Sequence, residues 1–105
     1  MKFAICQELF EGWEWERQCE LIAEIGYTGI EAAPFTLAST IYELSADRRV
    51  ELRKQAEAHG LEIIGLHWLL AKTEGLYLTS PETPVREATR DYVVALGEDL
   101  SLIHI

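Results

Sequence analysis

The sequence predicts an α/β fold in which three short strands alternate with three helices, as in a partial (β/α)8 TIM barrel of about three βα units. The glycines expected to end the helices, Gly26, Gly60 and Gly97, are 34 and 37 residues apart. One barrel unit takes about 31 residues when ~250 residues are shared among eight units, so this period fits. A doubly wound sheet also alternates strands and helices, but the loop after the first predicted strand lacks a glycine-rich phosphate-binding pattern. We therefore expect parallel strands in the order 1-2-3, with helices on one face.

The expected strands are short runs of strand-forming residues. They cover residues 2–6, 29–32 and 61–67. The third is the clearest, because it is almost continuously apolar, as strands become when both of their faces are covered.

The first helix is predicted from apolar positions at helical spacing, and both of the first two helices from residues suited to helix ends. The first begins at Trp15 and is ended by Gly26, a residue common just after a helix. The second has Ser45 as its N-cap and ends at Gly60.

The third helix is predicted to begin after Thr83, with Pro84 at its first position, and to end at Gly97. Its apolar stripe recurs every three or four residues and consists of Val85, Ala88, Thr89, Tyr92, Val93 and Leu96.

Composition limits the class of protein. The net charge is −9, and the basic residues gather only at 48–54, mixed with acidic ones as on a solvated helix face. A nucleic-acid binder would show a basic stripe, so we expect no nucleic-acid partner. Charges interrupt every apolar run well short of the ~20 residues that cross a bilayer. The N-terminal run is too short for a signal peptide, and we expect a cytoplasmic protein with no membrane contact.

The two cysteines, Cys6 and Cys19, make neither a zinc-ligand spacing nor a disulfide scaffold. Cys6 is interpreted as a small buried apolar residue rather than a nucleophile, because no histidine stands beside it in the sequence.

The last six residues, 100–105, differ from the pattern before them. The segment has no cap and no polar end, and it resembles the translated end of a transposon adapter used in sequencing libraries. We therefore expect residues 1–99 to be the native part of a longer chain and 100–105 to be an artefact, with a genuine apolar strand as the alternative.

Four segments, residues 2–6, 26–31, 60–68 and 78–81, resemble sugar-phosphate isomerases and epimerases of the xylose-isomerase-like, tagatose-epimerase-like barrel type. The resemblance implies an enzyme that moves a proton between adjacent carbons of a ketose or aldose. It also implies a small sugar substrate and a divalent metal, Mn²⁺, Mg²⁺, Co²⁺ or Zn²⁺. In that family the metal ligands, mostly Glu, Asp and His, come from later strands. We therefore expect the catalytic groups to lie on missing later strands, with no metal ligand set and no activity in these 105 residues alone.

Barrel active sites lie at the carboxyl ends of the strands, and this rule selects Glu8, Glu31, Phe35, His67 and Trp68 as substrate-binding candidates. Glu31 suits proton handling or a hydroxyl contact, with a structural carboxylate as the alternative. His67 is favoured as a substrate contact over a metal ligand, because no second histidine stands near it. Trp68 and Phe35 suit an apolar wall for a sugar face, with core packing as the alternative. Glu8 is interpreted as a solvated loop charge that is also a candidate for a hydroxyl contact.

Two other functions stay open. The first is an endonuclease-IV-like phosphodiesterase, which has a related barrel. The net charge of −9 and the absence of a basic stripe in the sequence argue against it, because such an enzyme binds DNA phosphates. The other is a catalytically inert α/β domain.

Overall fold

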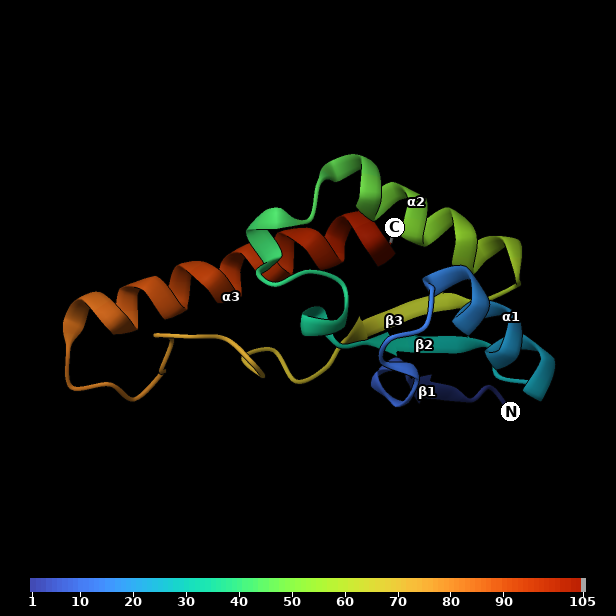
Figure 1. Ribbon diagram of the computed structural model, residues 1–105, viewed down its shortest axis with the longest axis horizontal. Helices are drawn as coiled ribbons and strands as arrows, with labels where there is room; N and C mark the ends of the chain where they lie inside the picture. Colours follow the sequence, from blue (N-terminus) through green and yellow to red (C-terminus); the bar gives the residue numbers. More distant parts are fainter. Residues whose placement is uncertain (105) are drawn as a thin grey trace.

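The three strands form one parallel sheet in the order β1-β2-β3. The computed structural model describes residues 1–104, and their side chains up to residue 101. The strands are β1, Ala4–Cys6, β2, Gly29–Ala32, and β3, Glu62–Leu66 (Figure 1). The predicted α/β fold and strand order are confirmed, and β1 and β3 are shorter than predicted.

Three helices alternate with the strands: α1, Trp15–Ile25, α2, Ala46–Ala58, and α3, Thr83–His104 (Figure 1). Gly26 follows α1 with φ of 109°, the left-handed conformation that glycine adopts without a steric penalty. The Ser45 hydroxyl accepts a hydrogen bond of 3.1 Å from the Arg48 backbone N–H, so it caps α2 as predicted.

Helix α3 contradicts the prediction that it ends at Gly97, because it continues to His104. Glycine inside a helix costs only about 1 kcal/mol, and packing on both sides of this position outweighs that cost. Leu96 and Asp99 are both buried against the body of the protein. The described part of the segment 100–105 is therefore helical rather than a strand, and Ile105 lies outside the described residues.

The core lies between one face of the sheet and the helices. Its members come from all three helices and from β2 and β3, and they include Trp15, Cys19, Ile22, Ile30, Leu52, Ile63, Tyr92 and Leu96. The Trp15 indole N–H donates a hydrogen bond of 2.9 Å to the Leu52 carbonyl, which ties α1 to α2. Trp15 is therefore a core residue, as its place on the helix stripe predicts.

Helices α2 and α3 are joined by an ion pair between Arg49 and Asp99. The Asp99 side chain is 5% exposed and that of Arg49 is 18% exposed. The interpretation of residues 48–54 as a solvated face is therefore wrong for Arg49, because α3 covers this part of α2. Its neighbour Arg48 is more exposed and pairs with Glu51 within α2, as expected for a solvated charge.

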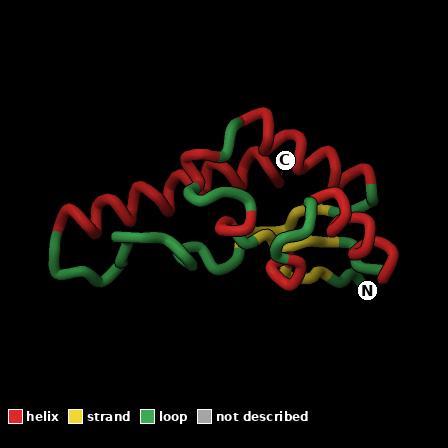
Figure 2. The backbone as a smooth tube through the Cα atoms, in the orientation of Figure 1, coloured by secondary structure: helices red, strands yellow, loops and turns green. Residues whose placement is uncertain are grey.

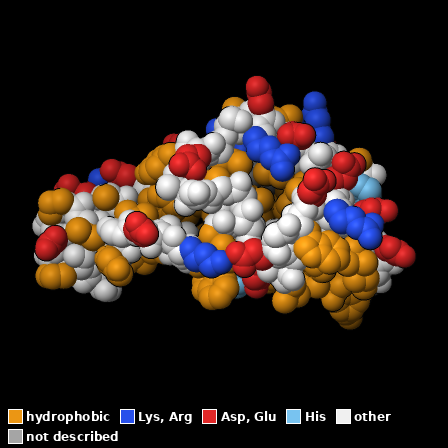
Figure 3. Space-filling view, in the orientation of Figure 1, with side chains coloured by type: hydrophobic (Ala, Val, Ile, Leu, Met, Phe, Trp, Pro, Cys, Tyr) orange, Lys and Arg blue, Asp and Glu red, His pale blue; other side chains and the backbone are white. Residues whose placement is uncertain are grey.

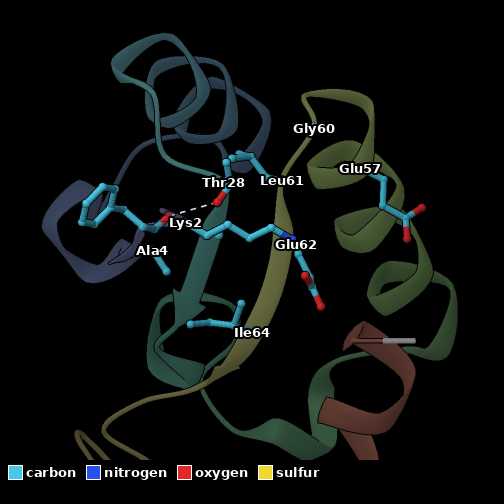
Figure 4. Close-up of a pocket in the computed structure, with 10 residues that line it drawn as sticks. Lys2, Ala4, Thr28, Glu57, Gly60, Leu61, Glu62 and Ile64 are labelled. Carbon is cyan, nitrogen blue, oxygen red and sulfur yellow. Dashed lines mark hydrogen bonds between the residues drawn. The ribbon is translucent and has the colours of Figure 1, made fainter.

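The opposite face of the sheet, called the open face below, carries Ala4, Cys6, Gly29, Glu31 and Ile64. Ile64 is 50% exposed there. Figure 4 shows the end of this face at which the strands begin, with Ala4, Thr28 and Ile64 around a pocket. Figure 3 shows apolar side chains gathered beside the N-terminus, where Phe3 is also exposed.

The connection between β3 and α3, residues 67–82, contains no helix or strand. It runs beside the first half of α3 before turning back into it (Figure 2). The Tyr77 backbone N–H donates a hydrogen bond of 2.9 Å to the Thr89 hydroxyl, which fastens the connection to α3. Loops of this length in compact folds are uncommon and are often functional. No helix of the described residues is long and apolar enough to cross a membrane.

Candidate functional site

Four polar side chains meet at the carboxyl ends of the strands. We call Cys6, Glu8, Glu31 and His67 the polar cluster. The Cys6 Sγ–H donates a hydrogen bond of 3.0 Å to Glu31 Oε2. His67 Nε2 lies 3.5 Å from Glu8 Oε1. Donor atoms of Cys6, Glu31 and His67 all lie within 4.8 Å of one another. The structure thus brings three of the predicted site residues together with a cysteine that had been assigned only to packing.

Strand register explains the contact between Cys6 and Glu31. These residues are direct partners in the parallel pairing of β1 with β2. Side chains alternate between the two faces of a strand, and Ile5 and Ile30 pack in the core. Their neighbours Cys6 and Glu31 must therefore stand on the open face.

A bulge in β3 brings His67 to the same face. Ile30 pairs with Ile63, but the next residue of β2, Glu31, pairs with Gly65, so β3 contains one extra residue. Strict alternation from the buried Ile63 would turn His67 toward the helices. The extra residue reverses that alternation, so that Leu66 packs against the core and His67 turns to the open face.

Gln7 fixes the turn that carries Glu8. Its side chain is fully buried, and its Oε1 accepts hydrogen bonds of 2.8 Å from the Ala33 N–H and from the Thr36 hydroxyl. Its Nε2 donates a hydrogen bond of 3.0 Å to Gln18 Oε1 in α1. The loops after β1 and β2 are thereby tied to each other and to a helix. The sequence does not reveal this role, apart from the position of Gln7 between Cys6 and Glu8.

The polar cluster carries an excess of negative charge. The hydrogen bond to Glu31, burial, and the charges of Glu31 and Glu8 together raise the pKa of the Cys6 thiol to about 11. Glu8 Oε2 is buried and has no hydrogen-bond partner among the described residues. Within residues 1–104, no lysine or arginine forms an ion pair with either carboxylate. Cys6 is therefore a polar member of the cluster and not only a small buried apolar residue. The interpretation of Glu8 as a solvated loop charge is wrong, because its side chain is only 21% exposed.

The two predicted aromatic residues lie beside the cluster. The rings of Phe35 and Trp68 meet edge to face, with their centroids 5.9 Å apart. The His67 ring is also 5.9 Å from that of Trp68, and Lys72 Nζ lies 4.5 Å from the Phe35 centroid. Trp68 is 61% exposed and has φ of 60°, an unusual conformation for a bulky residue. Such strained backbone is common at functional sites.

The architecture is that of part of a (β/α)8 barrel, with polar groups at the strand ends where such barrels hold their active sites. The solved structure of D-psicose 3-epimerase in the presence of D-fructose is similar to this chain, with a TM-score of 0.75 and 20% sequence identity. The match covers 98% of this chain and 34% of the epimerase, so the chain spans about a third of that protein's length. No protein-family model matches the chain. A search of curated protein sequences also gives no match.

Proposed function

We propose that this chain supplies the first three βα units of a metal-dependent sugar or sugar-phosphate isomerase or epimerase. The observation that carries the proposal is the structural match to an epimerase barrel over 98% of the chain. The position of the polar cluster at the carboxyl ends of β1 to β3 supports it, because barrel enzymes bind their substrates there. The reaction would transfer a proton between adjacent carbons of a ketose or aldose.

In this proposal the chain's own residues bind and orient the sugar. Glu31 and Glu8 are carboxylates that can accept hydrogen bonds from sugar hydroxyls, and no described residue donates a hydrogen bond to Glu8 Oε2. His67 lies between these acids and Trp68, where its ring nitrogens reach a hydroxyl of the same ligand. Trp68 and Phe35 offer an apolar surface for the C–H face of a sugar ring.

A divalent metal, Mn²⁺, Mg²⁺, Co²⁺ or Zn²⁺, would polarise the sugar carbonyl and favour removal of the neighbouring proton. The mostly Glu, Asp and His ligands for that metal would come from later strands. Within this chain the donors nearest to such a set are those of Cys6, Glu31 and His67, which lie at the ends of the first three strands and not on later ones. We therefore assign sugar binding, and not the catalytic proton transfer, to the residues of this chain.

The test begins with the source DNA. An independent clone read past the Asp99 codon should continue for ~150 residues, with Glu, Asp and His at strand ends, because a complete barrel takes about 250 residues. It should also lack the segment 100–105, which we propose is adapter sequence. A reading frame that stops within a few codons of Asp99 would exclude the proposal.

The full-length protein is then assayed for epimerisation of D-fructose and related ketoses with each metal, and for cleavage of abasic-site DNA. We expect sugar turnover and no DNA cleavage. Glu31→Gln should lower kcat/KM by about 10- to 100-fold, because a hydrogen bond to a charged group contributes ~1.5–3 kcal/mol. Glu24→Gln, on the exposed face of α1, is the matched control and should leave kcat/KM unchanged. DNA cleavage without sugar turnover would favour the phosphodiesterase instead.

A further inference from the structure

We propose that Cys6, Glu31 and His67 form a binding site for Zn²⁺ at the carboxyl ends of the three strands. Their donor atoms, a sulfur, a carboxylate oxygen and an imidazole nitrogen, lie within 4.8 Å of one another. The site is built from this chain's own side chains. It therefore stands whether or not the full-length protein is an epimerase.

The geometry needs little change to hold the ion. Zinc lies about 2.3 Å from thiolate sulfur and about 2.0–2.2 Å from imidazole nitrogen or carboxylate oxygen, which places tetrahedral donors roughly 3.4–3.6 Å apart. Cys6 Sγ and Glu31 Oε2 are already 3.0 Å apart. Movements of about 1 Å or less per side chain therefore produce the tetrahedral spacing, and rotation about side-chain bonds supplies them.

The choice of donors points to zinc rather than to magnesium or calcium. Mg²⁺ and Ca²⁺ prefer oxygen ligands alone, whereas thiolate and imidazole favour Zn²⁺ and its close analogue Co²⁺. On binding, the Cys6 S–H bond breaks, a sulfur–metal bond forms, and the proton leaves to solvent. Three protein donors leave a fourth position for water or a ligand oxygen, as in zinc sites that act on a substrate.

The surroundings favour a cation. In the described part of the chain nothing donates a hydrogen bond to the buried Glu8 Oε2, and the other oxygen of Glu8 lies 3.5 Å from His67 Nε2. The negative charge of Glu8 would increase the affinity of the site for a divalent ion. Lys72, which lies over the Phe35 ring, is paired with Glu11 at 2.7 Å. With Cys6 deprotonated, the two carboxylates and the thiolate carry three negative charges, of which a divalent ion would neutralise two.

The experiment is a titration of the metal-free 105-residue chain with Co²⁺, followed by absorption spectroscopy. We expect visible bands of a tetrahedral ion together with a near-ultraviolet band from thiolate to Co²⁺, and both should disappear when Zn²⁺ displaces the cobalt. Cys6→Ser should lose the thiolate band. Cys19→Ala should keep it, because Cys19 lies in the core away from the cluster. Glu8→Gln should weaken Co²⁺ binding by about 10-fold, because it removes a negative charge beside the ion.

A second measurement does not depend on variants. Zn²⁺ should slow the modification of Cys6 by a thiol reagent, with Cys19 as the internal reference after peptide mapping. If the chain precipitates without metal, Zn²⁺ in the refolding buffer should raise the soluble yield of the wild-type chain but not of Cys6→Ser, since a ligand of the folded state stabilises it. The proposal is overturned if the wild-type chain shows no thiolate band or if Cys6→Ser keeps it. It is also overturned if Zn²⁺ changes neither the rate of Cys6 modification nor the soluble yield.

Discussion

Replacing Gly29 with alanine is expected to destabilise the protein, because the open face has no room for a methyl group at that position. A Cβ added to Gly29 would lie 3.0 Å from Ala4 Cβ and 3.1 Å from Ile64 Cγ2. Carbon atoms pack best at about 3.5–4.0 Å, so the new methyl group would overlap both neighbouring strands by about 0.4–1 Å. The central strand β2 would have to separate from β1 and β3, or the Ile64 side chain would have to turn away.

The magnitude follows from two opposing effects. Overpacking of this kind costs about 1–3 kcal/mol. Against it, alanine restricts the unfolded chain and returns about 0.4–1 kcal/mol. Ile64 is 50% exposed and can move, but Ala4 Cβ is fixed by the β1 backbone. Because only one of the two neighbours can move, we take an overpacking cost near the middle of its range. After subtraction of the opposing effect, the free energy of unfolding should fall by about 1 kcal/mol.

The assay is urea denaturation followed by circular dichroism, with Gly65→Ala as the matched control. Gly65 lies in the adjacent strand, and a Cβ added there meets none of the atoms that the structure describes within 4 Å. Its replacement should leave stability unchanged or raise it. Combining Gly29→Ala with Ile64→Ala should recover part of the loss, because one of the two close contacts is removed. Equal stability of the Gly29→Ala and Gly65→Ala variants would refute the reasoning.

Three further predictions concern other parts of the chain. Gly97→Ala should raise the free energy of unfolding by about 0.5–1 kcal/mol, because α3 continues through this position and a Cβ there meets no described atom within 4 Å. Asp99→Asn should lower it by about 3 kcal/mol, since it leaves the largely buried Arg49 without its partner. In the metal-free chain, alkylation of Cys6 should accelerate only as the pH approaches about 11, and Glu31→Gln should move this transition toward the ordinary value of 9.0. Because folding raises this pKa, the stability that the thiol contributes is fully present below pH 9.0 and is lost as the pH rises to about 11.

Each of these predictions has a measurement that can contradict it. Thermal or urea denaturation that shows Gly97→Ala to be destabilising would mean that α3 ends near that residue. An Asp99→Asn variant as stable as the wild type would mean that its ion pair adds no net stability. Mass spectrometry of alkylated peptides distinguishes Cys6 from Cys19, whose pKa burial raises to about 12. A Cys6 titration that Glu31→Gln leaves unchanged would contradict the assigned cause.

The sequence alone determined the fold class and most helix boundaries, because these depend on local periodicity and on residues with strong backbone preferences. Gly26 and Ser45 occupy the positions expected of a helix C-cap and N-cap. The three strands followed from short strand-forming runs, and their order followed from the handedness of βαβ connections. The end of α3 was not predicted, because tertiary packing outweighs the propensity of the single residue Gly97.

The polar cluster was decided by the tertiary structure. The position of His67 at a strand end was visible in the sequence, but its direction depends on one extra residue in β3, and no periodicity reveals which residue of a short apolar run is bulged. Cys6 and Glu31 are 25 residues apart and become neighbours only through strand register. Gln7 likewise acquires its role from partners in a distant loop and a helix. Sequence patterns report which face of an element is apolar, whereas a binding site depends on distances between elements, which register and packing set.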